Sequence, residues 1–251
     1  MTILAIDTST QWCSVALVNH SGGLGSSNGE SKPPFSLIKH ENLGPESSQY
    51  ALDWVEALLE EAQLNFRDLD AIAVGIGPGA FTGIRIGVGI GQGMAFAADL
   101  PCLPIVCLDA VALEGIERLS LSTHETVLVA VDARMSEVYW ALYSVEDNGL
   151  PKRLGDVYLS APDAIDLPHT SFSLVGNAIT AYPEAMISIK ERAEKVDAEA
   201  LPHARSIAKL GLDALAKGLQ VNAAELQPIY VRDKVAQTIA ERALEQTAQT
   251  K

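Results

Sequence analysis

A glycine-rich stretch, residues 75–80, is the first place in the chain where residue types and spacing suggest chemistry. Its sequence GIGPGA satisfies G-x-G-x-x-A, follows the apolar run 71–74 and precedes a helix-like segment. Such a turn can bind a pyrophosphate through backbone N–H groups at a helix N-terminus. However, Pro78 lacks a backbone donor, and Asp109 lies well past the ~20-residue spacing of a ribose-binding acid. The residues therefore favour a tight turn over a dinucleotide site.

The second candidate is Asp7-Thr8-Ser9-Thr10, which directly follows the apolar run 3–6. A carboxylate beside hydroxyl groups can hold a phosphate and Mg²⁺. The same residue types also form Asx turns, in which the side chains bond only to their own backbone. From these residues alone, both interpretations stay open.

Other hydrolytic chemistries lack their residues in this chain. The histidines are scattered, with no H-E-x-x-H or similar metal-binding spacing. The phosphate-binding signature Gly-Lys-Ser/Thr is absent, and so is the nucleophile motif G-x-S-x-G. We therefore expect neither a metal site nor a serine nucleophile.

The helix-like segment 82–98 is unusually rich in glycine, which costs a helix interior about 1 kcal/mol per residue relative to alanine. Residues four apart share a helix face. One such row is Gly83, Gly87 and Gly91, with Gly89 and Gly93 beside it. We expect this row to form a groove for a ligand or a second subunit. A second face is expected to pack on the sheet through Ile86, Ile90 and Met94.

Strands and helices must position these residues, and the first half of the chain predicts a mixed sheet with helices on its faces. The expected strands are 3–6, 13–18, a weak third strand after a turn at Gly22-Gly23, 71–74 and 103–108. The expected helices are 45–64, where apolar residues recur at three and four, 82–98 with Thr82 as N-cap, and 109–119.

The second half repeats this order of strands before helices. Strands are expected at 127–131, 137–145, 154–159 and 172–175, with a turn at 132–134, and a helix at 202–219. The segment 227–232 then leads into a polar tail. We expect two related lobes, residues 1–115 and 116–251, although no sequence repeat proves a duplication.

Bulk properties limit the partners and the compartment. Lys and Arg total 18 against 32 Asp and Glu, a net charge of -14, so the chain alone should bind nucleic acid poorly. Its three cysteines form no CxxC pair, which suits a reducing cytoplasm. The chain has no signal-peptide pattern and no apolar stretch near the ~20 residues of a membrane span. We expect a cytoplasmic protein without membrane contact.

Four segments together resemble a known family. They are LAIDTSTQWCSVALV at 4–18, GIGPGAFTGIRIG at 75–87, VDARMSEVYWALY at 131–143 and PIYVR at 228–232. They resemble the TsaB (YeaZ) family of bacterial tRNA threonylcarbamoyladenosine (t6A) proteins, within the ASKHA/glycoprotease-like superfamily. The resemblance implies an α/β fold of two ASKHA (actin-like, ribonuclease H-like) lobes, each a mixed sheet with flanking helices.

The resemblance also implies that this chain has no catalytic residues. TsaD, the related transferase that modifies adenosine 37 of tRNAs reading ANN codons, binds its metal through a histidine pair. The matching region here, residues 106–112, contains no histidine. Asp7, Thr8 and Ser9 remain from a nucleotide-contacting turn, while Gln11-Trp12 replaces its acidic continuation. These three would form a degenerate nucleotide site; the alternative is a residual ATPase or glycoprotease-like peptidase.

Finally, the resemblance implies a scaffold. Family members homodimerise and bind TsaD through largely the same surface, the ATPase TsaE joins the assembly, and tRNA is bound only indirectly. ATP and Mg would be used by the complex, with no cofactor held tightly by this chain. The interface would involve the helices 45–64 and 82–98. Its residues would be Trp54, Leu58, Phe81, Gly83, Arg85, Gly87 and Gly91.

Overall fold

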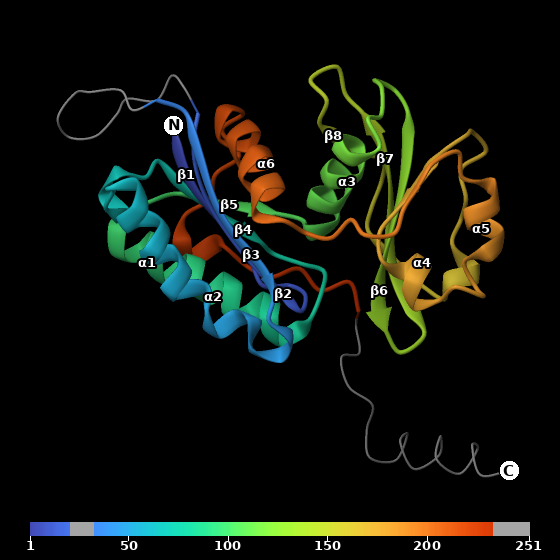
Figure 1. The fold of residues 1–251 in the computed structure, drawn as a ribbon, viewed down its shortest axis with the longest axis horizontal. Coiled ribbons are helices and arrows are strands. Elements are labelled where there is room, and N and C mark those ends of the chain that lie inside the picture. The colour runs from blue at the N-terminus through green and yellow to red at the C-terminus, as the bar shows by residue number, and fades with distance from the viewer. Residues whose placement is uncertain (21–32, 233–251) are drawn as a thin grey trace, which may run out of the picture.

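The computed structural model describes residues 1–20 and 33–232, which form two lobes that lie side by side (Figure 1). Each lobe is built on one mixed β-sheet, as expected for the two-lobed ASKHA class. The expected turn at Gly22-Gly23 and the polar tail after residue 232 lie outside the described residues.

The first sheet has the strand order β3-β2-β1-β4-β5. Its strands are β1 Thr2–Asp7, β2 Trp12–Asn19, β3 Phe35–Asn42, β4 Ala71–Gly75 and β5 Cys102–Ile105. The neighbours β1, β2 and β3 pair antiparallel, whereas β4 pairs parallel with both β1 and β5. Leu4 and Ile6 face one layer of helices, and Ile3 and Ala5 face another. Because both faces are covered, the central strands are continuous apolar runs.

Two long helices cover the first of these faces. α1 is Ala51–Ala62, with the 3₁₀ turn η1 Gly44–Gln49 before it and η2 Phe66–Asp68 after it; α2 is Phe81–Ala98. The expected helices are confirmed, but the N-cap of α2 is Ala80 rather than Thr82. Within the described ranges, no helix is both long and apolar enough to cross a membrane.

The second sheet repeats the connectivity of the first. Its elements are β6 Thr126–Arg134, β7 Glu137–Val145, β8 Pro151–Arg153, β9 Tyr158–Ser160, η3 Pro162–Ala164, β10 Ser173–Val175, α4 Ala178–Ala181, α5 Ile187–Arg192 and β11 Val196–Asp197. In the order β11-β10-β6-β7-β8, the strand β6 pairs antiparallel with β7 and parallel with β10, as β1 does with β2 and β4. The two lobes thus share the same pattern of strand pairing, while their descent from a duplication stays a prediction. The turn expected at 132–134 lies instead at residues 135–136, because β6 continues to Arg134.

The lobes do not divide at residue 115, because each exchanges one helix with the other. α3, Cys107–Arg118, follows β5 but buries its apolar face on the second sheet. α6, Ala204–Ala216, follows β11 but covers the remaining face of the first sheet. The two helices stand together between the lobes, where Arg205 and Ser206 both bond to Glu114 (Figure 1). The 3₁₀ turn η4, Ala223–Glu225, then packs beside α2.

Candidate functional site

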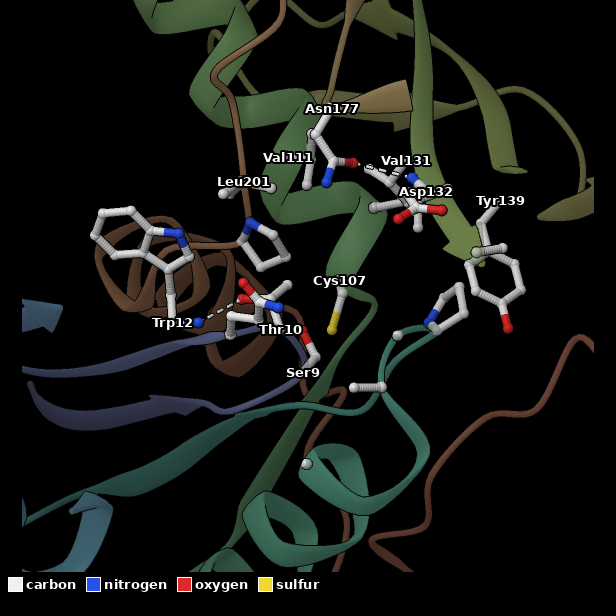
Figure 2. Close-up of a pocket in the computed structure, with 18 of the residues that line it drawn as sticks. Ser9, Thr10, Trp12, Cys107, Val111, Val131, Asp132, Tyr139, Asn177 and Leu201 are labelled. Carbon is white, nitrogen blue, oxygen red and sulfur yellow. Dashed lines mark hydrogen bonds between the residues drawn. The ribbon is translucent and has the colours of Figure 1, made fainter. Parts of the chain in front are cut away.

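A cleft of about 580 Å³ lies between the two lobes (Figure 2). Ser9, Thr10 and Trp12 border it from the first lobe, while Asp132 and Tyr139 border it from the second. The β1–β2 turn and the β6–β7 turn therefore face each other across the cleft. They occupy equivalent positions in the repeated topology, and each carries an aspartate: Asp7 ends β1, and Asp132 lies two residues before the end of β6.

Asp7 does not present its carboxylate to the cleft. Its Oδ1 atom accepts hydrogen bonds from Ser9 N (3.1 Å) and Ser9 Oγ (2.9 Å), and its Oδ2 atom accepts one from the Cys107 thiol (3.4 Å). The thiol sulfur in turn accepts from Gly77 N at 3.1 Å. Burial raises the pKa of Asp7 above its ordinary value, against the lowering effect of these hydrogen bonds. Burial and the nearby Asp7 charge also raise the pKa of Cys107.

Of the residues expected at a degenerate nucleotide site, Asp7, Thr8 and Ser9, only Ser9 lines the cleft, so a nucleotide contact of the other two stays a prediction. All three are only 1% exposed. Thr8 Oγ1 instead donates a 2.7 Å hydrogen bond to the carbonyl oxygen of Gly83. Ser9 alone borders the cleft, with its hydroxyl committed to Asp7. The Asx-turn alternative is the one that the geometry supports.

The residues that line the cleft do not fit a Mg²⁺–nucleotide. Asp132 is the carboxylate among them, and it accepts hydrogen bonds from Arg134 N (2.7 Å) and Tyr182 Oη (2.7 Å). It also forms an ion pair with the Arg134 side chain. In the part of the chain that the structure describes, no three potential metal ligands cluster. Asp132 at the cleft and the buried Asp7 behind it are thus both held by internal partners.

The glycines of the 75–80 turn and of early α2 have a structural purpose that the geometry makes plain. A Cβ atom at Gly83 would overlap the carbonyl oxygen of Thr8, and one at Gly79 would stand 2.6 Å from that of Ser9. Ala80 N also donates a 2.7 Å hydrogen bond to Ser9 O. The tight turn therefore packs backbone to backbone against the β1–β2 turn.

The same geometry overturns the expected interface row on α2. A Cβ at Gly87 would lie 2.6 Å from Thr8 Oγ1, and one at Gly91 would lie 2.5 Å from Val74 Cγ2. With Gly83, these glycines face the chain's own first lobe; Gly87 and Gly91 are buried there, and Gly83 is half-buried at the cleft. Ile84, Val88 and Ala95 form the buried face in place of Ile86, Ile90 and Met94, of which Met94 alone is buried.

Two further expected interface residues are part of the core. Trp54 is 9% and Leu58 is 1% exposed, and both lie on the face of α1 that packs into the core of the first lobe. Phe81 and Arg85, by contrast, keep exposed surface at the start of α2, so their role at an interface stays a prediction.

The open face of α2 carries the other pair of glycines, Gly89 and Gly93, where an added Cβ would meet no atom within 4 Å. They belong to a shallow apolar depression of about 620 Å³. Its other lining residues are Leu52, Phe66, Arg67, Ile86, Ile90, Met94, Ala97 and Ala98. Nearby on the same helix, Phe96 is 84% exposed. We call this surface, including Phe96, the α2 outer face; the i, i+4, i+7 spacing of Gly89, Gly93 and Phe96 is the sequence signal for it.

Comparisons with known proteins agree with this picture. The family model described as "TsaD: tRNA N6-adenosine threonylcarbamoyltransferase" matches residues 41–248. The tRNA threonylcarbamoyladenosine biosynthesis protein TsaB of Escherichia coli is 34% identical over 94% of this chain and 96% of its own length. That of Haemophilus influenzae is 32% identical over 94% and 95%. The solved structure of YeaZ from Pseudomonas aeruginosa is 35% identical, with a TM-score of 0.78 over 91% of this chain and 99% of that one.

Proposed function

Because this chain belongs to the TsaB (YeaZ) family and is thus a homologue of proteins of tRNA t6A biosynthesis, we propose that it is the non-catalytic scaffold of that modification. In this role it binds the transferase subunit TsaD through the α2 outer face. The observation that carries the proposal is this face itself, an apolar depression with open glycines on a helix whose opposite side is buried.

The α2 outer face suits a protein partner on physical grounds. Gly89 and Gly93 leave room for another helix to approach closely, since their backbone is not covered by a side chain. Phe96 and Leu52, which is 53% exposed, supply large apolar surfaces that gain from burial. In the absence of TsaD, a second copy of the chain would cover the same face, which gives a homodimer that competes with the complex.

The remaining components of the reaction would come from the partners. The net charge of -14 disfavours direct contact with tRNA, so TsaD would bring the nucleic acid. Since the carboxylates of Asp7 and Asp132 are both engaged within the chain, ATP and Mg²⁺ would be bound by TsaD and by the ATPase TsaE. The alternative of a residual ATPase or peptidase acting through Asp7 loses its support, because that carboxylate is buried and fully bonded.

The test is to introduce Gly89→Glu and to measure both TsaD binding and t6A formation in a reconstituted system with TsaD, TsaE and tRNA. A charged side chain in the apolar depression should abolish the pull-down and the modification together. Leu154→Glu, at a residue that is 47% exposed on the second lobe, is the matched control and should behave as the wild type. If Gly89→Glu supports TsaD binding at the wild-type level, the α2 outer face is not the docking surface.

A further inference from the structure

The segment 226–232 passes from the first lobe to the second along the lower side of the molecule in Figure 1. It begins inside the first lobe, where Leu226 is fully buried and its carbonyl oxygen accepts a 2.8 Å hydrogen bond from Gln92 Nε2 of α2. Ile229 N then donates a 2.9 Å hydrogen bond to the carbonyl oxygen of Ile76, next to the glycine turn. This end of the segment is therefore anchored to α2 and β4.

Tyr230 adds a side-chain anchor on the same lobe. Its hydroxyl accepts a 2.7 Å hydrogen bond from Arg85 Nε. The Arg85 guanidinium lies 3.7 Å from the centre of the Phe81 ring, and the rings of Phe81 and Tyr230 are 5.7 Å apart. A cation over an aromatic ring is favourable, so the contacts of Arg85 with Phe81 and Tyr230 join α2 to the segment on the outer surface as well.

The next two residues, Val231 and Arg232, bind the chain to the second lobe. Val231 packs on the core of that lobe. The Arg232 side chain is only 14% exposed and donates hydrogen bonds to the carbonyl oxygens of Ala133 (3.2 Å) and Arg134 (3.3 Å). It also forms an ion pair with Glu137. The Arg232 guanidinium thus forms hydrogen bonds or an ion pair with both strands of the β6–β7 hairpin.

The tip of this hairpin needs such a partner. Arg134, Met135 and Ser136 have φ angles of 63°, 56° and 58°, a left-handed conformation that side-chain-bearing residues adopt rarely and hold only when their surroundings enforce it. Arg232 satisfies the carbonyl of Arg134 and lies 3.1 Å from Met135 Sδ. The same tip borders the cleft.

The chain crosses between the lobes at two other places as well, but on another side of the molecule. The connections β5–α3 and β11–α6 lead into two helices that contact each other on the upper side of Figure 1, whereas 226–232 joins the lobes on the lower side. Lobes joined along one side only can rotate about that side as a hinge. A third link opposite the hinge opposes the rotation, because its length and anchors are fixed at both ends.

We propose that residues 226–232 form an interlobe strap that holds the cleft at one opening, with Tyr230 as its anchor on the first lobe and Arg232 as its anchor on the second. The strap acts within a single chain. The proposal is therefore independent of TsaD binding, and its test needs no partner.

The test measures the distance between the lobes with paired spin labels at Ser36→Cys and Glu191→Cys, two exposed positions on opposite lobes. The native Cys13, Cys102 and Cys107 are buried and will not compete for the label. Labelled protein is diluted with unlabelled protein so that distances within one chain dominate. The wild type should give a single narrow distance distribution, and Arg232→Ala should broaden it.

Hydrogen exchange provides the second readout. In Arg232→Ala the amides of residues 133–137 should exchange about ten-fold faster, while those of α5 keep their wild-type rates. Arg192→Ala, which removes a solvent-exposed arginine from the same lobe, is the matched control. If Arg232→Ala does not fold, Arg232→Lys keeps the charge without the forked donors and is measured in the same way. A distance distribution as narrow as that of the wild type, in a folded Arg232 variant, overturns the strap.

Discussion

Thr8 and Gly87 lie in direct contact, since a Cβ atom at position 87 would stand 2.6 Å from Thr8 Oγ1. That hydroxyl already donates to the carbonyl oxygen of Gly83, one turn earlier in α2. The absence of a side chain at position 87 is thus what allows α2 to lie against the β1–β2 turn. Two kinds of glycine occur along this one helix: those packed against other residues of the first lobe, and those whose Cβ position is open.

We predict that Gly87→Ala destabilises the fold, because the added methyl group must displace Thr8 from its hydrogen bond. Overpacking of this kind costs about 1–3 kcal/mol. Gly89→Ala is the matched control: its Cβ has free space, and alanine favours the helix by up to about 1 kcal/mol. Denaturant unfolding at one fixed protein concentration measures both variants. Equal stability of Gly87→Ala and the wild type would contradict the close contact.

We predict that Phe96→Ser weakens self-association without loss of folding. The ring is 84% exposed, so its removal leaves the core intact, while burying a phenylalanine side chain stabilises an interface by about 1.5–3 kcal/mol. The dimer dissociation constant should rise about ten-fold or more in sedimentation velocity. Leu219→Ser removes a side chain that is 60% exposed beyond the end of α6 and should leave association unchanged. An unaltered constant for Phe96→Ser would place the dimer contact elsewhere.

Asp7 should make a pH-dependent contribution to stability that falls as pH rises. Burial raises its pKa in the folded protein above the ordinary 3.8, so the folded state keeps the proton to higher pH than the unfolded chain does. The free energy of unfolding from this group therefore falls as pH rises from about 3.8 through the raised pKa. Asp7→Asn cannot ionise, and its oxygen can still accept from Ser9.

The measurement is the difference in unfolding free energy between Asp7→Asn and the wild type across this pH range. As pH rises, the unfolding free energy of Asp7→Asn should increase relative to that of the wild type. A constant difference would show that Asp7 titrates in the folded protein as it does in the unfolded chain.

The pair His40 and His203 should make a contribution to stability that rises with pH, opposite to that of Asp7. The rings of His40 and His203 stack with their centres 4.0 Å apart. Burial lowers the pKa of each from 6.5 to about 4, with the charges of His203 and Arg205 adding to the effect on His40. Glu114 opposes the shift at His40. In the folded protein, His203 Nδ1 accepts from Arg205 N at 3.0 Å, which requires an unprotonated nitrogen.

Because the unfolded chain binds protons at about pH 6.5 and the folded protein only near 4, stability should fall as pH drops through this window. We predict that His40→Phe, which keeps a flat ring in the stack, reduces this loss. Thermal unfolding of both proteins at several pH values checks it. Parallel curves for the variant and the wild type would contradict the lowered pKa of His40.

Much of the fold follows from the sequence, because the signals for it are local. The apolar runs that became β1, β2 and β4, and the three-and-four periodicity of α1, depend on residues close in the chain. The motifs at 4–18 and 75–87 likewise identify the family, since each is a short run of characteristic residues that can be recognised without the structure. The net charge and the missing histidines in 106–112 are also properties of the sequence alone.

Tertiary structure decided which surfaces are available. Gly87 and Gly89 obey the same local rules, and packing of α2 on Thr8 alone makes one internal and leaves the other open. Similarly, the sequence allows Asp7 to be a cleft residue, whereas in the structure its carboxylate oxygens accept hydrogen bonds from Ser9 and Cys107. The exchange of α3 and α6 between the sheets follows from how two apolar faces are buried, which connectivity does not reveal. The contacts of Gly87 with Thr8, of Asp7 with Cys107, and of α3 with the second sheet each join residues far apart in the chain, so spacing along the sequence does not reveal them.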